Sequence, residues 1–165
     1  MPFADIQVSA NIKAMNIPRI LSAAAAGTTM MTLFSYLTSE ARQKQFREPV
    51  LLNSLIKRLP VKSISRHNKS TAPGWLLHYA VGLMFSFAYD RVWQKTSADA
   101  TIANGLLLGS ISGVAGVAVW KKTFDMHPNP PKIPFQKYYL HLLAAHLVFG
   151  VFATLGYRLP GTKKI

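Results

Sequence analysis

The stretch ATIANGLLLGSISGVAGVAVW, residues 100–120, has no formally charged side chain and is long enough to cross a bilayer as a helix. The hydrocarbon core of a membrane is about 30 Å thick and needs about 20 mostly apolar helical residues. Three further stretches of 20 uncharged residues each lie at 20–39, 70–89 and 138–157. The pattern predicts an all-α, four-transmembrane-helix bundle with spans over about 20–38, 73–92, 100–120 and 138–157.

The composition of the chain argues against several protein classes. Nineteen Lys and Arg against six Asp and Glu give a formal net charge of +13 over 165 residues, and there is no cysteine. The basic residues flank the uncharged stretches, which indicates contact with a lipid bilayer and its anionic head groups and argues against nucleic acid. Disulfide frameworks and cysteine-ligated metal centres are excluded. We expect a single integral membrane domain over residues 1–165.

The long basic segment between the first two spans contains an amphipathic pattern over about 49–59. Its apolar side chains recur at helical spacing: Leu52, Leu55, Ile56 and Leu59. The segment is too short and too charged to span a membrane. It is therefore predicted to form a short interfacial helix that lies in the head-group region.

The distribution of Lys and Arg predicts the orientation. Segments 40–72 and 121–137 together hold twelve of them, and the remaining seven lie at the termini and between the second and third spans. Loops rich in Lys and Arg stay in the cytoplasm. We therefore expect 40–72 and 121–137 to be cytoplasmic and both termini to lie outside.

Glycines recur every four residues in the third span. Gly105, Gly109 and Gly113 form two overlapping GxxxG steps, which Gly116 continues. Helices in lipid associate through small residues that allow close approach of their backbones. The glycine face predicts helix packing, either within the bundle or between two copies in a homodimer.

Two histidines lie deep within predicted spans and share a local pattern. His78 and His146 are each the ninth residue of an uncharged stretch, and each is followed four positions later by a glycine, Gly82 or Gly150. Tyrosine and arginine follow in both helices, so the two halves of the chain resemble duplicated helical hairpins. Because ionisable residues inside a membrane are costly, the pair is a functional hypothesis.

Four interpretations of these histidines remain open. His78 and His146 can ligate a haem, haem b being the candidate cofactor, with the two glycines leaving room for the macrocycle. A metal site can instead include His141, His127 or Glu48. A third interpretation is a proton or quinone relay. In the fourth, the histidines hydrogen-bond to hydroxyl groups and stabilise the bundle.

A line of hydroxyl side chains in the first span supports the fourth interpretation. Thr28, Thr32, Ser35 and Ser39 fall on one helical face. We expect this face to point into the bundle, where such groups can accept or donate hydrogen bonds.

Catalytic signatures such as GxSxG, HExxH, the P-loop and GxGxxG do not occur. Asp90 and Arg91 follow the second uncharged stretch, where an anchor that pairs with a neighbouring helix end is favoured over a transport site. The sequence predicts an integral membrane protein without catalysis, a structural or accessory subunit of a membrane complex. A haem- or metal-binding redox protein is the alternative, and a small transporter comes third.

Several of these motifs together resemble a known group of proteins. They are WxxH from Trp75 to His78, HxxxG in two helices, the glycine-spaced stretch, and a proline-rich loop, MHPNPPKIPF, before the last span. The combination resembles the uncharacterised small four-helix bacterial inner-membrane proteins described as YagU-like, over about half of the chain. The resemblance implies a bacterial inner-membrane location and no established activity.

Overall fold

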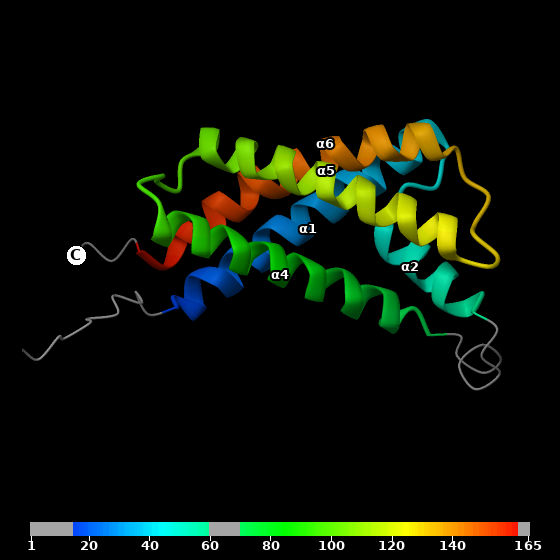
Figure 1. The fold of residues 1–165 in the computed structure, drawn as a ribbon, viewed down its shortest axis with the longest axis horizontal. Helices are drawn as coiled ribbons and strands as arrows, with labels where there is room; N and C mark the ends of the chain where they lie inside the picture. Colours follow the sequence, from blue (N-terminus) through cyan, green and yellow to red (C-terminus); the bar gives the residue numbers. More distant parts are fainter. Residues whose placement is uncertain (1–14, 60–69, 162–165) are drawn as a thin grey trace, which may run out of the picture.

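The computed structural model describes residues 15–59 and 70–161, and these are helical with short connections and no strand (Figure 1). The elements are α1 (Ile17–Arg42), α2 (Glu48–Lys57), α4 (Ala72–Lys95), α5 (Ile102–Met126), α6 (Phe135–Arg158) and the single 3-10 turn η1 (Leu159–Gly161). The prediction of an all-α fold is confirmed for this part of the chain.

Within the described part of the chain, three helices are long and apolar enough to cross a membrane: α1, α5 and α6. Three such helices are compatible with an integral membrane protein. Helix α4 is 24 residues long but does not belong to this group. Length and apolarity therefore support three of the four predicted spans.

The long helices mostly extend past the predicted spans, because a helix ends at its caps and not at the first charge. Helix α1 continues to Arg42, and α5 continues through two lysines to Met126. At its start α5 is shorter than predicted, because the side chain of Thr101 accepts a hydrogen bond from the Asn104 amide and caps the helix there.

Helix α6 lies between α1 and α5 and packs along both, while α4 packs against α1 and α2. Small residues make the α1–α6 contact close, since Ala23, Ala145 and Ala153 are fully buried. Helices α4 and α5 run antiparallel and are joined by a short connection. Their backbones rarely come close to one another, although the Tyr89 and Ser112 hydroxyls form a buried hydrogen bond of 2.8 Å between them.

Helix α2 confirms the short helix that the amphipathic pattern predicts, and its interfacial location stays a prediction. Leu55 and the polar Asn53 are buried, Leu52 and Ile56 are half-buried and Leu59 is exposed. Asn53 Oδ1 accepts a hydrogen bond of 2.9 Å from the amide of Gly74, an N–H that the first turn of α4 cannot satisfy itself. A tertiary cap of α4 therefore determines which side of α2 faces the protein.

The hydroxyl face of α1 points into the bundle, as predicted. Thr28, Thr32, Ser35 and Ser39 are all buried. This polar line runs along the inner side of α1 and provides hydrogen-bonding groups for α2, α4 and α6.

At the end of the bundle where α4 meets α6, a carboxylate is fully buried. Asp90 accepts hydrogen bonds from the Tyr157 hydroxyl (2.7 Å), from Gln94 Nε2 (2.6 Å) and from Arg91 Nη2 (2.6 Å). The cross-helix partner of Asp90 is thus a tyrosine near the end of α6, and the predicted pairing with a neighbouring helix end is confirmed.

Candidate functional site

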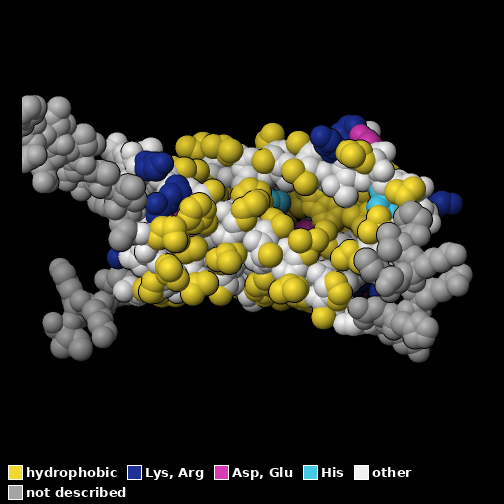
Figure 2. All heavy atoms as spheres, turned by 60° about the horizontal axis from the view of Figure 1, so that its bottom comes forward, with side chains coloured by type: hydrophobic (Ala, Val, Ile, Leu, Met, Phe, Trp, Pro, Cys, Tyr) yellow, Lys and Arg dark blue, Asp and Glu magenta, His cyan; other side chains and the backbone are white. Residues whose placement is uncertain are grey.

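A cavity of about 330 Å³ lies where α4 and α5 diverge, and α1, α2 and α6 close its other sides. Figure 2 shows it as a hollow with hydrophobic walls, a histidine at its edge and an acidic side chain at its base. Most lining side chains are apolar, and Trp120, Phe85 and Phe149 contribute aromatic surface. This volume lies near the lower limit for small-molecule sites in proteins.

A sharp turn after α1 brings Glu48 under this cavity. Gln43 adopts the left-handed conformation (φ 49°), and its amide bonds to the Glu40 carbonyl as α1 ends. The chain then reverses, and the Ser39 hydroxyl accepts a hydrogen bond of 3.1 Å from the Phe46 amide. Glu48 follows in the first turn of α2, where the positive end of the helix dipole favours an acidic side chain.

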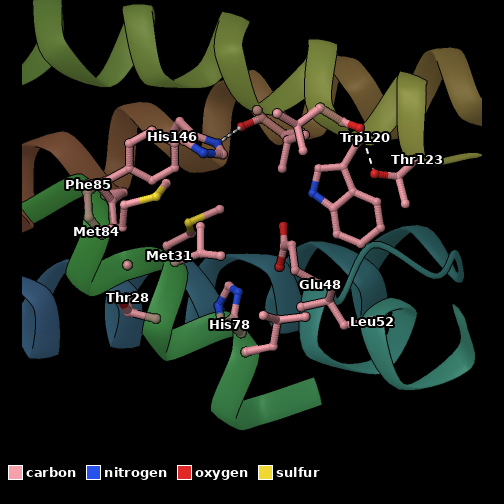
Figure 3. A pocket seen from close by; sticks show the side chains of 17 residues that line it. Thr28, Met31, Glu48, Leu52, His78, Met84, Phe85, Trp120, Thr123 and His146 are labelled. Carbon is pink, nitrogen blue, oxygen red and sulfur yellow. Dashed lines mark hydrogen bonds between the residues drawn. The ribbon is translucent and has the colours of Figure 1, made fainter. Parts of the chain in front are cut away.

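Glu48 is only 2% exposed, and its two oxygens have different surroundings. Oε1 accepts a hydrogen bond of 2.9 Å from the Ser35 hydroxyl. Oε2 is buried and has no partner among the described residues, and the carboxyl group points into the cavity (Figure 3). Burial raises the pKa of Glu48 to about 8, so the group is mostly a neutral acid at pH 7. Because Oε1 accepts from Ser35, the acidic hydrogen belongs on Oε2.

His141 holds Ser35 from the other side. Its Nε2 lies 2.9 Å from Ser35 Oγ and 3.7 Å from Glu48 Oε1. Since the single hydroxyl hydrogen of Ser35 goes to Glu48, His141 Nε2–H donates to Ser35. The imidazole stacks between the rings of Phe34 and Phe46, at 5.3 and 4.8 Å. This chain of contacts fixes the orientation of the Glu48 carboxyl group.

His78 is buried in the wall that α4 contributes. Its Nε2 lies 2.9 Å from the hydroxyl of Thr32, and that hydroxyl donates to the Thr28 carbonyl at 2.7 Å. Thr32 therefore has no hydrogen left for His78, and His78 Nε2–H is the donor. The ring is the neutral tautomer with Nδ1 as acceptor.

His146 is buried in the wall that α6 contributes. Its Nδ1 lies 2.9 Å from the Leu142 carbonyl, which can only accept, so Nδ1 carries the hydrogen and Nε2 is an acceptor. Gly116 of α5 leaves room for this ring, because a Cβ there would lie 2.8 Å from His146 Cε1. A side chain at position 116 would displace the imidazole from the cavity.

The structure brings His78 and His146 to the same cavity, but the two glycines beside them are used for helix contacts. A Cβ at Gly82 would collide with Thr28 of α1, and one at Gly150 would lie 2.9 Å from the Cα of Gly109 in α5. Neighbouring helices thus occupy the space that the haem interpretation assigns to a macrocycle. The duplicated hairpin stays a prediction.

The residues of the predicted metal set are only partly together. His141 and Glu48 are neighbours, but His127 Nε2 lies 3.0 Å from the Leu55 carbonyl and contacts neither of them. Across residues 15–59 and 70–161, no three side chains of His, Cys, Asp or Glu are grouped closely enough to hold a metal ion.

The four glycines of α5 lie on its α6-facing side. Gly105 lies against the backbone of Gly150 and Gly109 against the His146 carbonyl. Gly113 and Gly116 follow one and two turns later, against the Cβ and the ring of the same histidine. Helix α6 therefore approaches α5 closely along most of its length.

Sequence reasoning missed how the cavity is built. The sequence indicated Glu48 only as a possible metal ligand. It indicated Ser35, which donates a hydrogen bond to Glu48, only as one hydroxyl of the α1 face. That face was the available signal, because a buried row of hydroxyls requires polar partners. The aromatic and methionine side chains of the walls carry no pattern that separates them from ordinary lipid-facing residues.

The chain was compared with protein-family models, with curated proteins and with solved structures, and none of them matches it. A fold by itself does not define a function. The function is therefore argued from the geometry of the cavity.

Proposed function

We propose that the protein is a four-span integral membrane protein that takes up a small lipid-soluble molecule from the bilayer and holds it without converting it. The observation that carries this proposal is the cavity between α4 and α5, two helices with few close backbone contacts, joined by a hydrogen bond of 2.8 Å between the Tyr89 and Ser112 hydroxyls. Exposed apolar side chains such as Leu77, Met84 and Val119 border it. In a membrane such side chains contact acyl chains, so a ligand can enter sideways from the hydrocarbon core.

Helix α4 is the fourth span in this proposal. Its 24 residues reach about 36 Å at 1.5 Å per residue, enough to cross a bilayer core. Its outward side chains are apolar, with Leu76 76% exposed and Met84 and Phe87 also exposed. The polar side chains His78 and Asp90, which lower its apolarity, are buried inside the bundle.

The proposed orientation follows from a basic groove at one end of α1 and α6. Arg42, Lys44 and Lys137 line it together with Phe34 and other apolar side chains, and no carboxylate of the described part of the chain does so. The neighbouring Lys137 lowers the pKa of Lys44, as expected for cations that lack a counter-charge. Anionic lipid head groups of the cytoplasmic leaflet suit such a groove, which supports a cytoplasmic location for this end of the bundle.

Cysteine labelling tests the fourth span and the orientation together. The chain has no natural cysteine, so Thr71→Cys before α4 and Ser97→Cys after it each provide one exposed thiol. A membrane-impermeant maleimide is expected to label Ser97→Cys in intact cells and Thr71→Cys only after permeabilisation. Labelling of both thiols from the same side would contradict a membrane-spanning α4, and the reverse pattern would invert the orientation.

Closing the entrance tests ligand uptake. Val119→Phe is expected to weaken the binding of 1-bromodecane about tenfold, a loss of about 1.4 kcal/mol, because the larger ring fills the space between α5 and α4. Binding is measured as bromine quenching of Trp120 fluorescence in detergent, with Trp120→Phe defining the contribution of the other tryptophans. The same quenching gives the affinity of each variant.

Val114→Phe is the matched control, since Val114 and Val119 are both 64% exposed on α5 and only Val119 lines the cavity. The control is expected to bind the probe as the unmodified protein does. Equal quenching in both variants would show that the probe meets Trp120 from the outer surface, and the proposed function would be wrong.

A further inference from the structure

A carboxyl oxygen at the cavity is buried without a partner. Glu48 Oε2 has no hydrogen-bond partner among the described residues and points into the cavity (Figure 3), whereas the Thr28 hydroxyl, also unpaired, lies against Gly82 of α4. A buried polar group left unpaired costs about 1–3 kcal/mol. Such groups in a ligand-sized cavity indicate that the ligand itself carries a polar group that satisfies them.

The histidines of the walls complement Glu48. Glu48 presents a donor, the hydrogen on Oε2, whereas Nε2 of His146 and Nδ1 of His78 are both acceptors. Figure 3 shows Glu48 between the side of the cavity that carries His78 and the side that carries Trp120. A polar head group that can only accept hydrogen bonds would leave the acceptor nitrogens of the histidines without a donor. A head group that can only donate would leave the Glu48 hydrogen without an acceptor.

Among the residues that the structure describes, no Lys or Arg lines the cavity and Glu48 is the only carboxylate there. A phosphate or carboxylate head would therefore be buried there without a cation, which is strongly unfavourable. An ammonium head would require Glu48 to be ionised, and burial opposes its ionisation at neutral pH. The head group that fits is uncharged.

We propose that the cavity binds a neutral amphiphile whose polar head is a hydroxyl group, of the class of long-chain or isoprenoid alcohols. A hydroxyl oxygen accepts the hydrogen bond from Glu48 Oε2–H, and its own hydrogen goes to an imidazole nitrogen of the wall. The alkyl part lies against the apolar walls and leaves between α4 and α5. This inference rests on the proposed function and names the class of its ligand.

A matched pair of probes tests the head group. At pH 6.5, 10-bromodecan-1-ol is expected to bind about tenfold more tightly than 1-bromodecane, after correction for partition into detergent, because it adds hydrogen bonds to buried groups. Both are measured by quenching of Trp120. The charged analogues 10-bromodecanoate and 10-bromodecylammonium are expected to bind more weakly than the alcohol.

Variants of Glu48 test whether this residue causes the preference for the alcohol over 1-bromodecane. In Glu48→Leu the alcohol is expected to lose its advantage over 1-bromodecane, while 1-bromodecane still binds. Glu48→Gln keeps an acceptor for Ser35 and an amide donor for the ligand, so it is expected to keep most of the preference even if the leucine variant folds poorly. The control is Glu40→Leu, an exposed glutamate of α1, which should bind both probes unchanged.

The outcomes separate this inference from the proposed function. If both probes bind equally and Val119→Phe weakens both, the cavity takes lipid-soluble molecules but the hydroxyl class is wrong. If a charged analogue binds most tightly, the neutral head group is wrong. If Val119→Phe affects no probe, the proposed function and this inference both fail.

Discussion

Replacing Gly109 with leucine is expected to lower the midpoint of thermal unfolding in detergent by about 10 °C, which corresponds to about 3 kcal/mol. A Cβ at this position would lie 2.6 Å from the carbonyl oxygen of His146 and 3.2 Å from the Cα of Leu147. Both are backbone atoms of α6, which cannot rotate out of the way as a side chain can. Helices α5 and α6 must therefore separate. Circular dichroism of the purified protein during heating measures the effect.

The control for Gly109→Leu lies on the same helix. Val114 is 64% exposed, so Val114→Leu adds one carbon on the outer surface and is expected to leave the midpoint unchanged. A similar loss in both variants would show that α5 tolerates no substitution for reasons unrelated to α6. An unchanged midpoint in Gly109→Leu would contradict the close approach of the two helices.

Replacing Asp90 with alanine is expected to reduce the free energy of unfolding by about 2–3 kcal/mol. Asp90 is 0% exposed and binds three donors, the Tyr157 hydroxyl, Gln94 Nε2 and the Arg91 guanidinium. Its removal leaves the tyrosine hydroxyl and the glutamine amide inside the protein without their acceptor. Unfolding titrations in a denaturing detergent measure the loss.

A double-mutant cycle isolates the contact between α4 and α6. Asp90→Ala, Tyr157→Phe and the combined variant are expected to give a coupling free energy of about 1–2 kcal/mol. Additive effects would mean that the hydrogen bond between Asp90 and Tyr157 does not stabilise the fold. Asp125→Ala is the exposed control, since its 2.7 Å ion pair with Lys121 lies at the surface and is expected to contribute less than about 1 kcal/mol.

The positions of the long helices could be predicted from the sequence, because charge-free stretches of about 20 residues are typical of helices that cross a membrane. The inward face of α1 could be predicted for a similar reason, since hydroxyls at helical spacing are better placed inside than in lipid. The helix ends could not, because caps such as Thr101 are local contacts that charge patterns do not detect.

The cavity could not be predicted, because its parts come from tertiary contacts. Glu48 reaches Ser35 only through the left-handed turn at Gln43, and a glutamate within a basic segment gives no sign of burial. Asn53 is turned inward by the first turn of α4, against the amphipathic pattern of α2. Each of these contacts joins residues that are far apart in the sequence and do not follow a helical repeat, so no sequence pattern indicates them.

The separation of α4 from α5 also required the structure. A short connection normally predicts neighbouring antiparallel helices, as for α5 and α6. Here the glycines draw α5 onto α6, while α4 is held by α1 and by the cap from α2. The preferences of each helix for other partners thus outweigh the shortness of the loop between them.

The sparse packing between α4 and α5 has a consequence for the proposed access from the membrane. Besides one hydrogen bond of 2.8 Å between the Tyr89 and Ser112 hydroxyls, their spacing depends on the helices behind them, which pack through the buried alanines of α1 and α6. In the proposed function, the width of the opening between α4 and α5 therefore depends on residues outside the cavity. Substitutions at Ala23 or Ala153 are then expected to change the rate at which a ligand exchanges with the bilayer, while the groups proposed to recognise the ligand stay in place.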